Sequence, residues 1–398
     1  ERAADMVSEL ETYDQERILR LVKPEELGPI VGEMETDDAA DLLQELDQQK
    51  AQQVLATLSS DDRKDVAQLL TYDPESAGGL MQTELVAVST AATVGDAVEA
   101  VREVAANADI ISVFVIDEDG RYAGNLALQD LVLSTEQTPV AQIMEAKVVD
   151  VPPDLDQEEV AKIFDRYSLV ELAVVDTSGK LLGRITADDV HEVLVEEAEE
   201  DLLKMAGTAA ERDVIYSGNV FQVVGQRLPW LMSTFFAGLL ASYILQSAET
   251  IFETAMILLM FVPVITGMSG NVGTQSAMIM IQGMAAGHID REALWSSIAK
   301  DITVSTIMAL TCGVITTVLV SLWKGHPALG LCVGLALTCS MITASVLGST
   351  EPALLKRLGV DPAVAAGPLI TSINDISGVI IFTLISMQFL EYLVVSPP

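Results

Sequence analysis

One carboxylate, Asp375, lies inside the long apolar segment 368–390, PLITSINDISGVIIFTLISMQFL. An unpaired charge at membrane depth costs at least about 2.5–3.5 kcal/mol, so such a side chain faces a wet cavity or a partner. The basic residues of the C-terminal half fall in predicted loops or at the ends of apolar segments, so no basic partner for Asp375 is evident. We favour a cation pathway. The alternative is a packing device in which neighbouring hydroxyl groups hydrogen-bond the carboxylate.

A second candidate is the segment 269–276, SGNVGTQS, which interrupts another apolar stretch. Small residues let backbone carbonyl and side-chain amide oxygens approach a pore, and oxygen is the ligand that hard cations prefer. Small residues also permit close helix packing, which is common in membranes. This segment alone leaves both interpretations open.

Acidic side chains crowd the segment 191–207, HEVLVEEAEEDLLKMAG. Glu192, Glu196 and Glu200 recur at four-residue spacing, so one helix face stacks like charges, which is destabilising without cations. A solvated acidic helix is the plain alternative. Because this segment joins an acidic region to an apolar one, we favour a cation-filled interface.

These candidates belong to two halves of different composition. Residues 1–220 contain 49 Asp and Glu against 16 Lys and Arg, whereas residues 221–398 contain 9 and 6 and nearly all the long apolar runs. The first half is therefore a strongly acidic soluble region, and the second has the composition of a membrane domain. This excludes a simple cytosolic enzyme, and the lack of a basic patch argues against nucleic-acid binding.

The cysteines and the first residue of the chain support two further expectations. The three cysteines, Cys312, Cys332 and Cys339, lie in apolar segments without the spacing of a zinc site or a disulfide framework, so we expect buried small hydrophobes. The chain opens on Glu1 rather than Met, and we expect the natural protein to begin before it.

Five stretches are long and apolar enough to cross a bilayer core of about 30 Å. They are Leu228–Ser247, Ile251–Met278, Ile302–Trp323, Ala328–Leu347 and Ala363–Leu390. The second and fifth contain internal Pro and Gly, which are tolerated at depth where backbone is buried or lines a cavity.

The charges of the loops orient these five spans. With residues 1–220 in the cytosol, the inner loops carry five basic residues (Arg227, Arg291, Lys300, Lys356 and Arg357), whereas the outer segments carry only Lys324. This asymmetry predicts a C-terminus outside the cell.

Two internal repeats organise the soluble half. Segments starting at residues 25, 37, 49 and 61 each open with polar or acidic residues and close on an apolar pair, which predicts stacked short helices in an all-α superhelical domain. Residues 84–197 hold a longer repeat at an offset of 59, in which Gly120 matches Gly179 and Asp130 matches Asp189. Each copy alternates an amphipathic helix with a hairpin between short β-branched strands.

The longer repeat resembles a pair of CBS domains, α/β modules that pack in tandem and sense adenosine nucleotides or ions. In the second copy, Gly183, Thr186 and Asp189 of GRITADD match the ribose-contacting G-x-x-T-x-x-D pattern of that family. The first copy has Ala127 where the hydroxyl group should be, so the resemblance implies at most one good nucleotide site. A purely structural or ion-sensing pair is the alternative.

The whole chain resembles the MgtE family of bacterial magnesium transporters and channels. The resemblance rests on the order of the regions and on four segments: YDPESAGGLM (72–81), ITADDVHEVLVEEAEEDLLKMAG (185–207), VPVITGMSGNVGTQSA (262–277) and LGVDPAVAAGPLITSINDISG (358–378). It implies a multidomain membrane protein with four regions: an acidic helical-repeat domain (1–80), tandem CBS domains (81–190), an acidic connecting helix and linker (191–220), and a five-span pore domain (221–398).

The resemblance also implies roles for individual residues. Asp375 matches the pore aspartate that selects the hydrated ion, and the pore-lining motifs contain Gly267, Asn271, Thr274, Gly367 and Thr371. Ser372 stands where a second Thr is frequent, and Ser168 replaces an acid at a regulatory position. Positions that hold regulatory cytosolic magnesium are matched by Asp156, Glu158, Asp189, Glu192, Glu197, Glu200 and Asp201, and Asp361 matches a membrane-domain carboxylate facing the connecting helix.

These matches predict a homodimeric, magnesium-selective channel or transporter of the cell membrane. Mg²⁺ is both its cargo and its regulator, and the CBS pair is expected to bind ATP or another adenosine nucleotide. An intramembrane protease would need paired deep aspartates or an HExxH motif, and the sequence has neither. Anion transport conflicts with a deep carboxylate. The competing function is CBS-regulated transport of another divalent cation, such as Mn²⁺ or Co²⁺.

Overall fold

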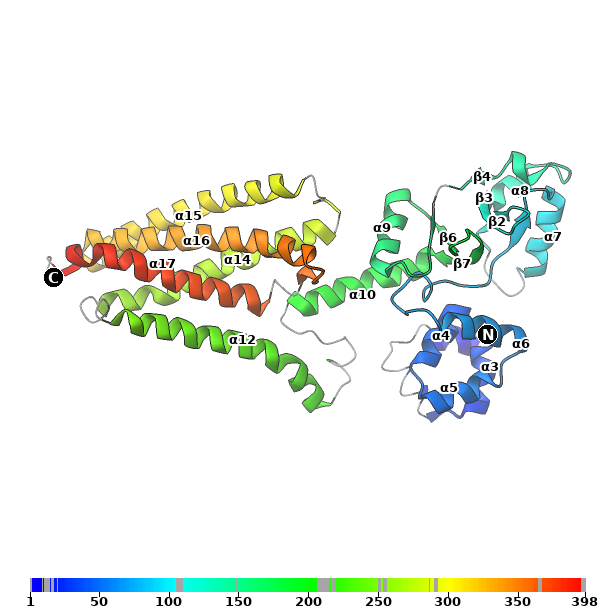
Figure 1. Ribbon diagram of the computed structural model, residues 1–398, viewed down its shortest axis with the longest axis horizontal. Coiled ribbons are helices and arrows are strands. Elements are labelled where there is room, and N and C mark those ends of the chain that lie inside the picture. The colour runs from blue at the N-terminus through cyan, green and yellow to red at the C-terminus, as the bar shows by residue number, and fades with distance from the viewer. Residues whose placement is uncertain are drawn as a thin grey trace. The chain divides into compact units, whose positions relative to one another are not determined.

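The computed structural model of the protein describes residues 2–8, 10, 15, 18–19, 21–104, 110–147, 149–205, 215, 219–249, 252, 256–285, 287–289, 293–363 and 367–394. The chain divides into two compact units, Glu1–Ala198 and Glu199–Pro398. The first unit contains the short helices and both sheets, and the second contains the long apolar helices (Figure 1). The predicted domain boundaries at residues 80, 190 and 220 stay a prediction.

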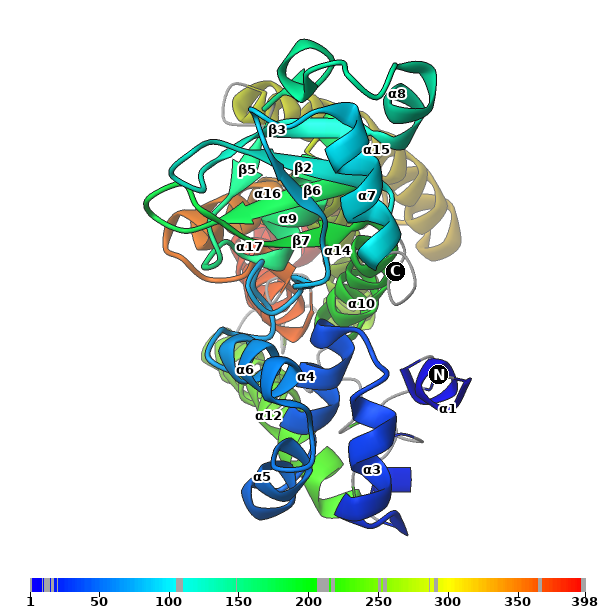
Figure 2. The same ribbon diagram turned by 90° about the vertical axis from the view of Figure 1, so that its right-hand side faces the viewer.

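Short helices begin where the first repeat predicts them. The N-terminal region contains α1 (Arg2–Ser8), α3 (Pro24–Val31), α4 (Thr36–Gln44), α5 (Gln48–Leu55) and α6 (Ser60–Leu69), and the last four lie together in one cluster (Figure 2). Each of these four starts one residue before the repeat start read from the sequence. The Asp47 side chain caps α5 by accepting from the backbone N–H groups of Gln49 and Lys50, at 3.1 and 3.0 Å.

The longer repeat folds into two small sheets. The first copy contains β1 (Ala87–Ser89), α7 (Val94–Val104), β2 (Ser112–Ile116), β3 (Tyr122–Ala127), α8 (Leu128–Leu133) and β4 (Glu145–Ala146). The second contains β5 (Asp150–Val151), α9 (Gln157–Tyr167), β6 (Glu171–Val175), β7 (Leu181–Thr186) and α10 (Ala187–Met205). The strand orders are β1-β2-β3-β4 and β5-β6-β7; the first two strands of each sheet are parallel and the other pairs antiparallel. The predicted α/β copies are confirmed.

The two predicted hairpins are also present. Their turns contain Gly120 and Gly179 at φ of 78° and 84°, a left-handed conformation that glycine adopts without a Cβ clash. The hairpins touch each other, because the Tyr122 N–H donates to the carbonyl oxygen of Gly179 at 3.0 Å. The β2-β3 and β6-β7 hairpins therefore lie side by side (Figure 2).

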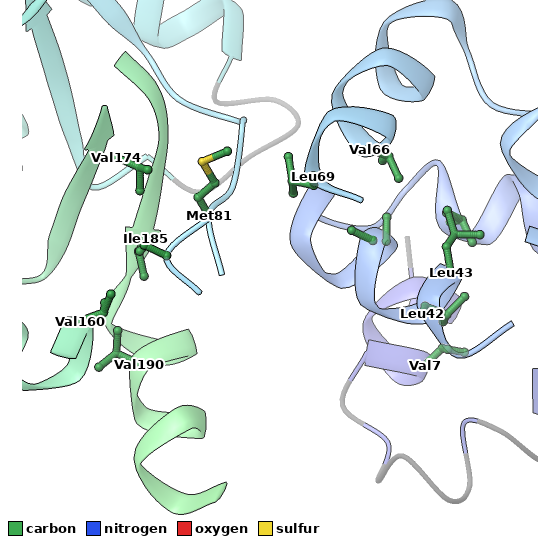
Figure 3. Close-up of a cluster of buried hydrophobic side chains, with 14 of the residues drawn as sticks. Val7, Leu42, Leu43, Val66, Leu69, Met81, Val160, Val174, Ile185 and Val190 are labelled. Carbon is green, nitrogen blue, oxygen red and sulfur yellow. The ribbon is translucent and has the colours of Figure 1, made fainter. Parts of the chain in front are cut away.

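The hydrophobic cores of the soluble unit are divided unequally. Val113, Val115 and Leu126 belong to a core made by the first copy alone. The second copy shares its largest core cluster with the N-terminal helices, and Figure 3 shows Met81, Val174 and Ile185 on one side of that cluster. The segment around Gln82 also pairs with β7, since the backbones of Gln82 and Arg184 exchange hydrogen bonds of 2.7 and 2.9 Å. The N-terminal helices are thus fastened to the second copy.

Helix α10 runs without a break from the second copy into the acidic segment. The predicted boundary at residue 190 therefore falls inside one helix. Residues 206–214 and 216–218 of the predicted linker lie outside the described residues.

Within the described residues, five helices are long and apolar enough to cross a membrane, as predicted: Val220–Ser247 (α12), Met256–Ala285, Leu294–Lys324 (α15), Pro327–Arg357 (α16) and Pro368–Leu393. The second combines the 3-10 helix Met256–Phe261 with α14 (Val262–Ala285), and α17 extends to Val394. Helices α12 and α15 begin eight residues before the predicted starts Leu228 and Ile302, because their first turns contain polar and charged residues, such as Arg227 and Lys300, that interrupt the apolar pattern. Among the described residues, the second span starts at Met256 and α17 at Pro368, and proline fits the first turn of α17, where its missing N–H costs nothing. Residues 251, 253–255 and 364–366 lie outside the described residues, so the predicted starts at Ile251 and Ala363 stay predictions.

The backbones of α14, α15 and α16 approach closely at glycine. A side chain at Gly348 of α16 would strike the backbone of Gly273 on α14, and one at Gly334 of α16 would strike the carbonyl oxygen of Gly313 on α15. A polar chain joins the same helices: Ser276 donates to the Ser345 hydroxyl at 3.3 Å, and Ser345 donates to Asp301 at 3.1 Å. These contacts make the three helices one tightly packed block.

Candidate functional site

The glycine- and polar-rich segment of α14 has two faces. Ser269, Gly273 and Ser276 are buried in helix packing. Asn271 is exposed and Thr274 is partly exposed, and both follow Gly267 at helical spacing of four and then three residues. The packing and the ion-pathway interpretations of this segment therefore apply to opposite sides of the same helix.

Helix α17 presents a similar division. Asn374 is fully buried against Gly273 of α14, where an added Cβ would collide with the Asn374 amide. On the other side, Thr371 and Asp375 are four residues apart and partly exposed. The partly open carboxylate therefore sits on a helix that packs directly against α14.

Neighbouring hydroxyl groups do not hold Asp375. The Ser372 hydroxyl donates to the carbonyl oxygen of Pro368 at 2.6 Å, and the Thr371 hydroxyl donates to that of Gly367 at 3.4 Å. Among the described residues, Asp375 takes part in no hydrogen bond or ion pair through its carboxylate. The packing-device interpretation lacks the bonds that it requires. Gly367 is buried, and its carbonyl oxygen is engaged by Thr371.

Asp361 contacts the connecting helix through a lysine. The Lys204 ammonium lies 2.7 Å from a carboxylate oxygen of Asp361 and 2.7 Å from one of Glu200. Burial opposes the charge of Lys204, but the hydrogen bonds to the two carboxylates outweigh it and raise the pKa above its usual value. The C-terminal end of α10 is thereby tied to the loop between α16 and α17. The sequence did not suggest this role for Lys204.

Several of the predicted regulatory acids of the second copy have protein partners. The Asp156 side chain caps α9 by accepting from the N–H of Glu158 at 2.9 Å, and Lys162 pairs with Glu158 at 2.8 Å. Glu197 accepts a hydrogen bond of 2.7 Å from Gln157. Glu192 is exposed, Asp201 is partly exposed, and Ser168 ends α9 with φ of 50°. Within the described part of the chain, no three His, Cys, Asp or Glu side chains are gathered as a ready-made metal site.

Acids of α4 and its N-terminus crowd against acids of α10. Burial, followed by repulsion from Asp189 and Asp38, raises the pKa of Glu35 to about 7. Desolvation, followed by repulsion from Asp38 and Glu196, raises the pKa of Asp41 to about 7, although Asp41 keeps part of its surface exposed. We call Glu35, Asp37, Asp38, Asp41, Asp189, Glu192 and Glu196 the acidic seam.

Sequence reasoning missed the α4 half of the acidic seam. Acids in a first helical turn are ordinary helix-start signals, and the repeat pattern gives Asp37 and Asp38 only that role. Asp37 is buried, and burial, followed by repulsion from Asp189, raises its pKa well above the usual range. The available signal was Asp41, an acid beyond the first turn and four residues after Asp37.

The predicted nucleotide motif is engaged within the protein. The Thr186 hydroxyl donates to Asp189 at 2.5 Å, and the Gln82 amide donates to the same carboxylate oxygen at 3.4 Å. Burial raises the pKa of Asp189, while the Thr186 hydrogen bonds oppose that effect. Gly183 packs under the Met81–Gln82 segment, so that a Cβ there would strike the carbonyl oxygen of Gln82. The structure brings these three motif residues together.

A buried ion pair lies beside this motif. The guanidinium of Arg184 is 2.5 Å from the carboxylate of Glu171, and both side chains are 2% exposed. The Ser112 hydroxyl of the first copy also donates to Glu171 at 2.5 Å. Charge is therefore buried where the second copy meets both the first copy and the Gln82 segment.

Models of three protein families match successive parts of the chain. The MgtE intracellular N domain matches residues 1–75, the CBS domain matches residues 77–134 and 140–196, and the divalent cation transporter domain of MgtE matches residues 262–385. This order agrees with the regions built above.

Relatives match over most of the chain. A magnesium transporter MgtE from Thermus thermophilus is 38% identical over 326 residues, which cover 81% of this chain and 72% of the relative. A magnesium transporter MgtE from Bacillus subtilis is 32% identical over a match that covers 82% of this chain and 72% of the relative. Both of these relatives are named as magnesium transporters, which are not enzymes.

Solved structures resemble the soluble unit. One, the soluble part of a magnesium transporter, has a TM-score of 0.47 at 33% identity and covers 49% of this chain and 77% of its own. Another, the cytosolic domain of the Mg²⁺ channel MgtE in complex with ATP, has a TM-score of 0.46 at 39% identity, with coverages of 48% and 78%. With the family models and the relatives taken together, this chain belongs to the MgtE family of magnesium transporters.

Proposed function

We propose that the protein is a magnesium-selective channel or transporter whose ion path runs along the open faces of α14 and α17. The observation that carries this proposal is Asp375, a carboxylate in a membrane-spanning helix without a protein partner among the described residues. Thr371 on the same face and Asn271 and Thr274 on α14 supply further oxygen atoms. In a homodimer with these faces on its two-fold axis, two copies of Asp375 enclose the path.

The chemistry of Mg²⁺ suits such a path. The ion gives up its waters reluctantly, so a pair of carboxylates holds it largely through its hydration shell. An elementary charge that crosses the membrane potential gains about 2.3 kcal/mol of free energy per 100 mV. A divalent cation that enters an inside-negative cell therefore gains about 4.6 kcal/mol per 100 mV. Influx therefore needs no ATP hydrolysis.

Cytosolic Mg²⁺ closes the path in this proposal. The acidic seam brings like charges together in the folded soluble unit, which destabilises that arrangement unless cations offset the repulsion. Regulatory ligands are drawn from the seam and from α9 and α10: Asp156, Glu158, Asp189, Glu192, Glu197, Glu200 and Asp201. If Mg²⁺ binds these acids more tightly in the closed arrangement, rising Mg²⁺ shifts the population toward closure.

The connecting helix carries this signal to the membrane domain. Lys204 already bridges Glu200 of α10 and Asp361 of the α16–α17 loop. A cation bound by Glu200 competes with Lys204 for that carboxylate. The position of α10 thus depends on the cation supply.

We further propose an adenosine-nucleotide site at Gly183, Thr186 and Asp189, for which the ATP complex of the related cytosolic domain is a precedent. The N-terminal region faces the cytosol and the C-terminus lies outside, as the basic loop residues indicate. Nucleotide binding would have to exchange the Gln82–Asp189 hydrogen bond for contacts with the ribose.

Ion flux into liposomes tests the transport proposal. The full chain is reconstituted with an inside-negative potential, and uptake of Mg²⁺, Mn²⁺ and Ca²⁺ is compared. Asp375→Asn keeps the shape of the side chain but removes its charge, and Glu391→Gln removes an exposed acid from the same helix as a matched control. We expect Mg²⁺ flux or selectivity to collapse only in the first variant. Preferential uptake of Mn²⁺ by the native protein would support the other divalent function, and unchanged flux in Asp375→Asn would refute the pore assignment.

Protease protection tests the regulatory proposal. Millimolar Mg²⁺ should protect the soluble region by offsetting repulsion within the acidic seam, and K⁺ at matched ionic strength should not. Equal protection by K⁺ would reduce the effect to screening. Neutralising several seam acids should leave a channel that stays open at high internal Mg²⁺.

A further inference from the structure

A cavity of about 440 Å³ lies in the membrane unit, where the start of α15 and the end of α16 meet the first turns of α17. Apolar side chains form most of its wall, among them Trp295, Leu354 and Ile373. Trp295 and Leu354 are 65% and 57% exposed, so the cavity wall is continuous with the outer surface of the helices. The residues assigned to the ion path do not line it.

Two opposite charges on α16 line the same cavity. Glu351 is partly buried and Arg357 is exposed. In the described parts of the chain, neither side chain forms an ion pair. A carboxylate against an apolar wall in a membrane is costly without a cationic partner. The cavity therefore has an unmatched acid and an unmatched base at one apolar site.

We propose that this cavity binds the headgroup of a phospholipid that carries both a primary ammonium and a phosphate, as phosphatidylethanolamine does. The ammonium donates hydrogen bonds to Glu351, and the phosphate accepts them from Arg357. An anionic headgroup would leave Glu351 without a partner. A quaternary ammonium has no N–H with which to donate.

The place of the cavity in the bilayer agrees with this ligand. It lies at the end of the bundle where Lys204 contacts Asp361, which is the end that carries the basic residues Lys356 and Arg357. Tryptophan prefers this headgroup depth. A volume of about 440 Å³ is within the range of small-ligand pockets, about 300–1,000 Å³. It accommodates the headgroup while the acyl chains remain in the membrane along Leu354.

Occupancy of the cavity bears on the ion path through α17. Ile373 lines the cavity and lies two positions before Asp375 on the same helix. A bound headgroup therefore braces the helix that carries the pore carboxylate against α15 and α16.

Fluorescence quenching in bilayers tests the proposal. The full chain with Trp230→Phe and Trp323→Phe retains Trp295 as its one tryptophan. It is placed in phosphatidylcholine bilayers with increasing amounts of lipids brominated near the headgroup. We expect Trp295 to be quenched at about tenfold lower mole fraction by brominated phosphatidylethanolamine than by brominated phosphatidylcholine or phosphatidylglycerol, the preference expected of one charge-assisted hydrogen bond.

The variants separate binding from general contact with lipid. Glu351→Gln should abolish the preference, and Glu391→Gln, an exposed acid near the other end of the bundle, should keep it. Native mass spectrometry of the otherwise unmodified chain should show phosphatidylethanolamine retained by the Glu391→Gln protein and lost from Glu351→Gln. Equal quenching by all three lipids, a preference for phosphatidylglycerol, or no quenching because a second copy of the chain covers the cavity would each overturn the proposal.

Discussion

The two CBS copies share one fold but differ in what their equivalent positions hold. At the offset of 59 residues, Glu171, Arg184 and Thr186 of the second copy stand where the first copy has Ser112, Asn125 and Ala127. The first copy encloses an apolar core of its own, whereas the second buries an ion pair and shares its core with the N-terminal helices. The duplicated scaffold therefore leaves room for specialisation: the charges lie in the copy that other regions of the soluble unit contact.

The largest expected difference between the copies concerns the buried ion pair. Glu171→Gln leaves the Arg184 charge uncompensated and should lower the free energy of unfolding of fragment 1–205 by about 3–5 kcal/mol, measured by urea denaturation. Asn125→Ala, at the position equivalent to Arg184, should lower the free energy of unfolding much less. The double variant Glu171→Leu, Arg184→Met should recover most of the loss. A similar cost for Glu171→Gln and Asn125→Ala would show that the two copies do not differ in this way.

Substitutions should change the affinity for ATP only when they are made in the nucleotide motif of the second copy. Thr186→Ala removes a hydroxyl from the proposed ribose site and should weaken ATP binding by about tenfold, the value of one good hydrogen bond. Asp189→Ala should act in the same direction, and Asp130→Ala in the first copy should have no comparable effect. Isothermal titration of fragment 1–205 measures these affinities. If millimolar ATP produces no heat, the CBS pair is left as an ion sensor.

The acidic seam should make the stability of fragment 1–205 depend on pH. Glu35 and Asp41 have pKa values of about 7 in the folded state, above their ordinary values near 4, so the folded state holds more protons than the unfolded state between these limits. The free energy of unfolding should therefore be greatest below about pH 4.5 and fall as the pH rises to 7, by about 1 kcal/mol after allowance for solvent screening.

Urea denaturation in chelator, at pH 5 and at pH 7, measures this slope. Asp41→Asn should flatten it, because the amide cannot lose a proton, and Asp130→Asn in the first copy should not. A stability that rises over this interval in the native fragment would contradict the assigned direction of the pKa shifts.

The smallest effect should come from the first copy. The Tyr122 hydroxyl donates to Asn125 at 3.0 Å, and burial raises the pKa of Tyr122 to about 12. Tyr122→Phe removes one neutral hydrogen bond and should cost about 0.5–1.5 kcal/mol in thermal or urea unfolding, less than Glu171→Gln. If Tyr122→Phe lowers the free energy of unfolding more than Glu171→Gln does, the larger polar contribution to stability lies in the first copy, which would contradict this prediction.

Local signals in the sequence predict most of the elements. Helices of the first repeat start one residue from their predicted positions, because caps and first-turn acids are local, and Gly120 and Gly179 mark the two hairpin turns. Average hydropathy is enough to find five spans. Their starts are harder to predict, since hydropathy excludes the polar first turns with which α12 and α15 begin.

Contacts between distant segments could not be predicted in the same way. Nothing near Lys204 in the sequence indicates that it meets Asp361, and nothing near Asp41 indicates that it approaches α10. Likewise, the predicted SGNVGTQS segment was one motif, but packing of Gly273 against α16 and α17 gives its two faces different environments. Periodicity identifies a face of a helix, whereas its neighbour depends on the tertiary fold.

The close glycine contacts of α14, α15 and α16 have a mechanical consequence. Where backbones touch, no layer of flexible side chains is left to deform, and sliding one helix along another would drive bulkier residues into the glycine positions. A displacement of one end of α16 therefore moves α14, α15 and α16 together as one rigid body. Asn271 and Thr274 of α14 move with it. The width of the ion path therefore changes through movement of α12 and α17 relative to this rigid body.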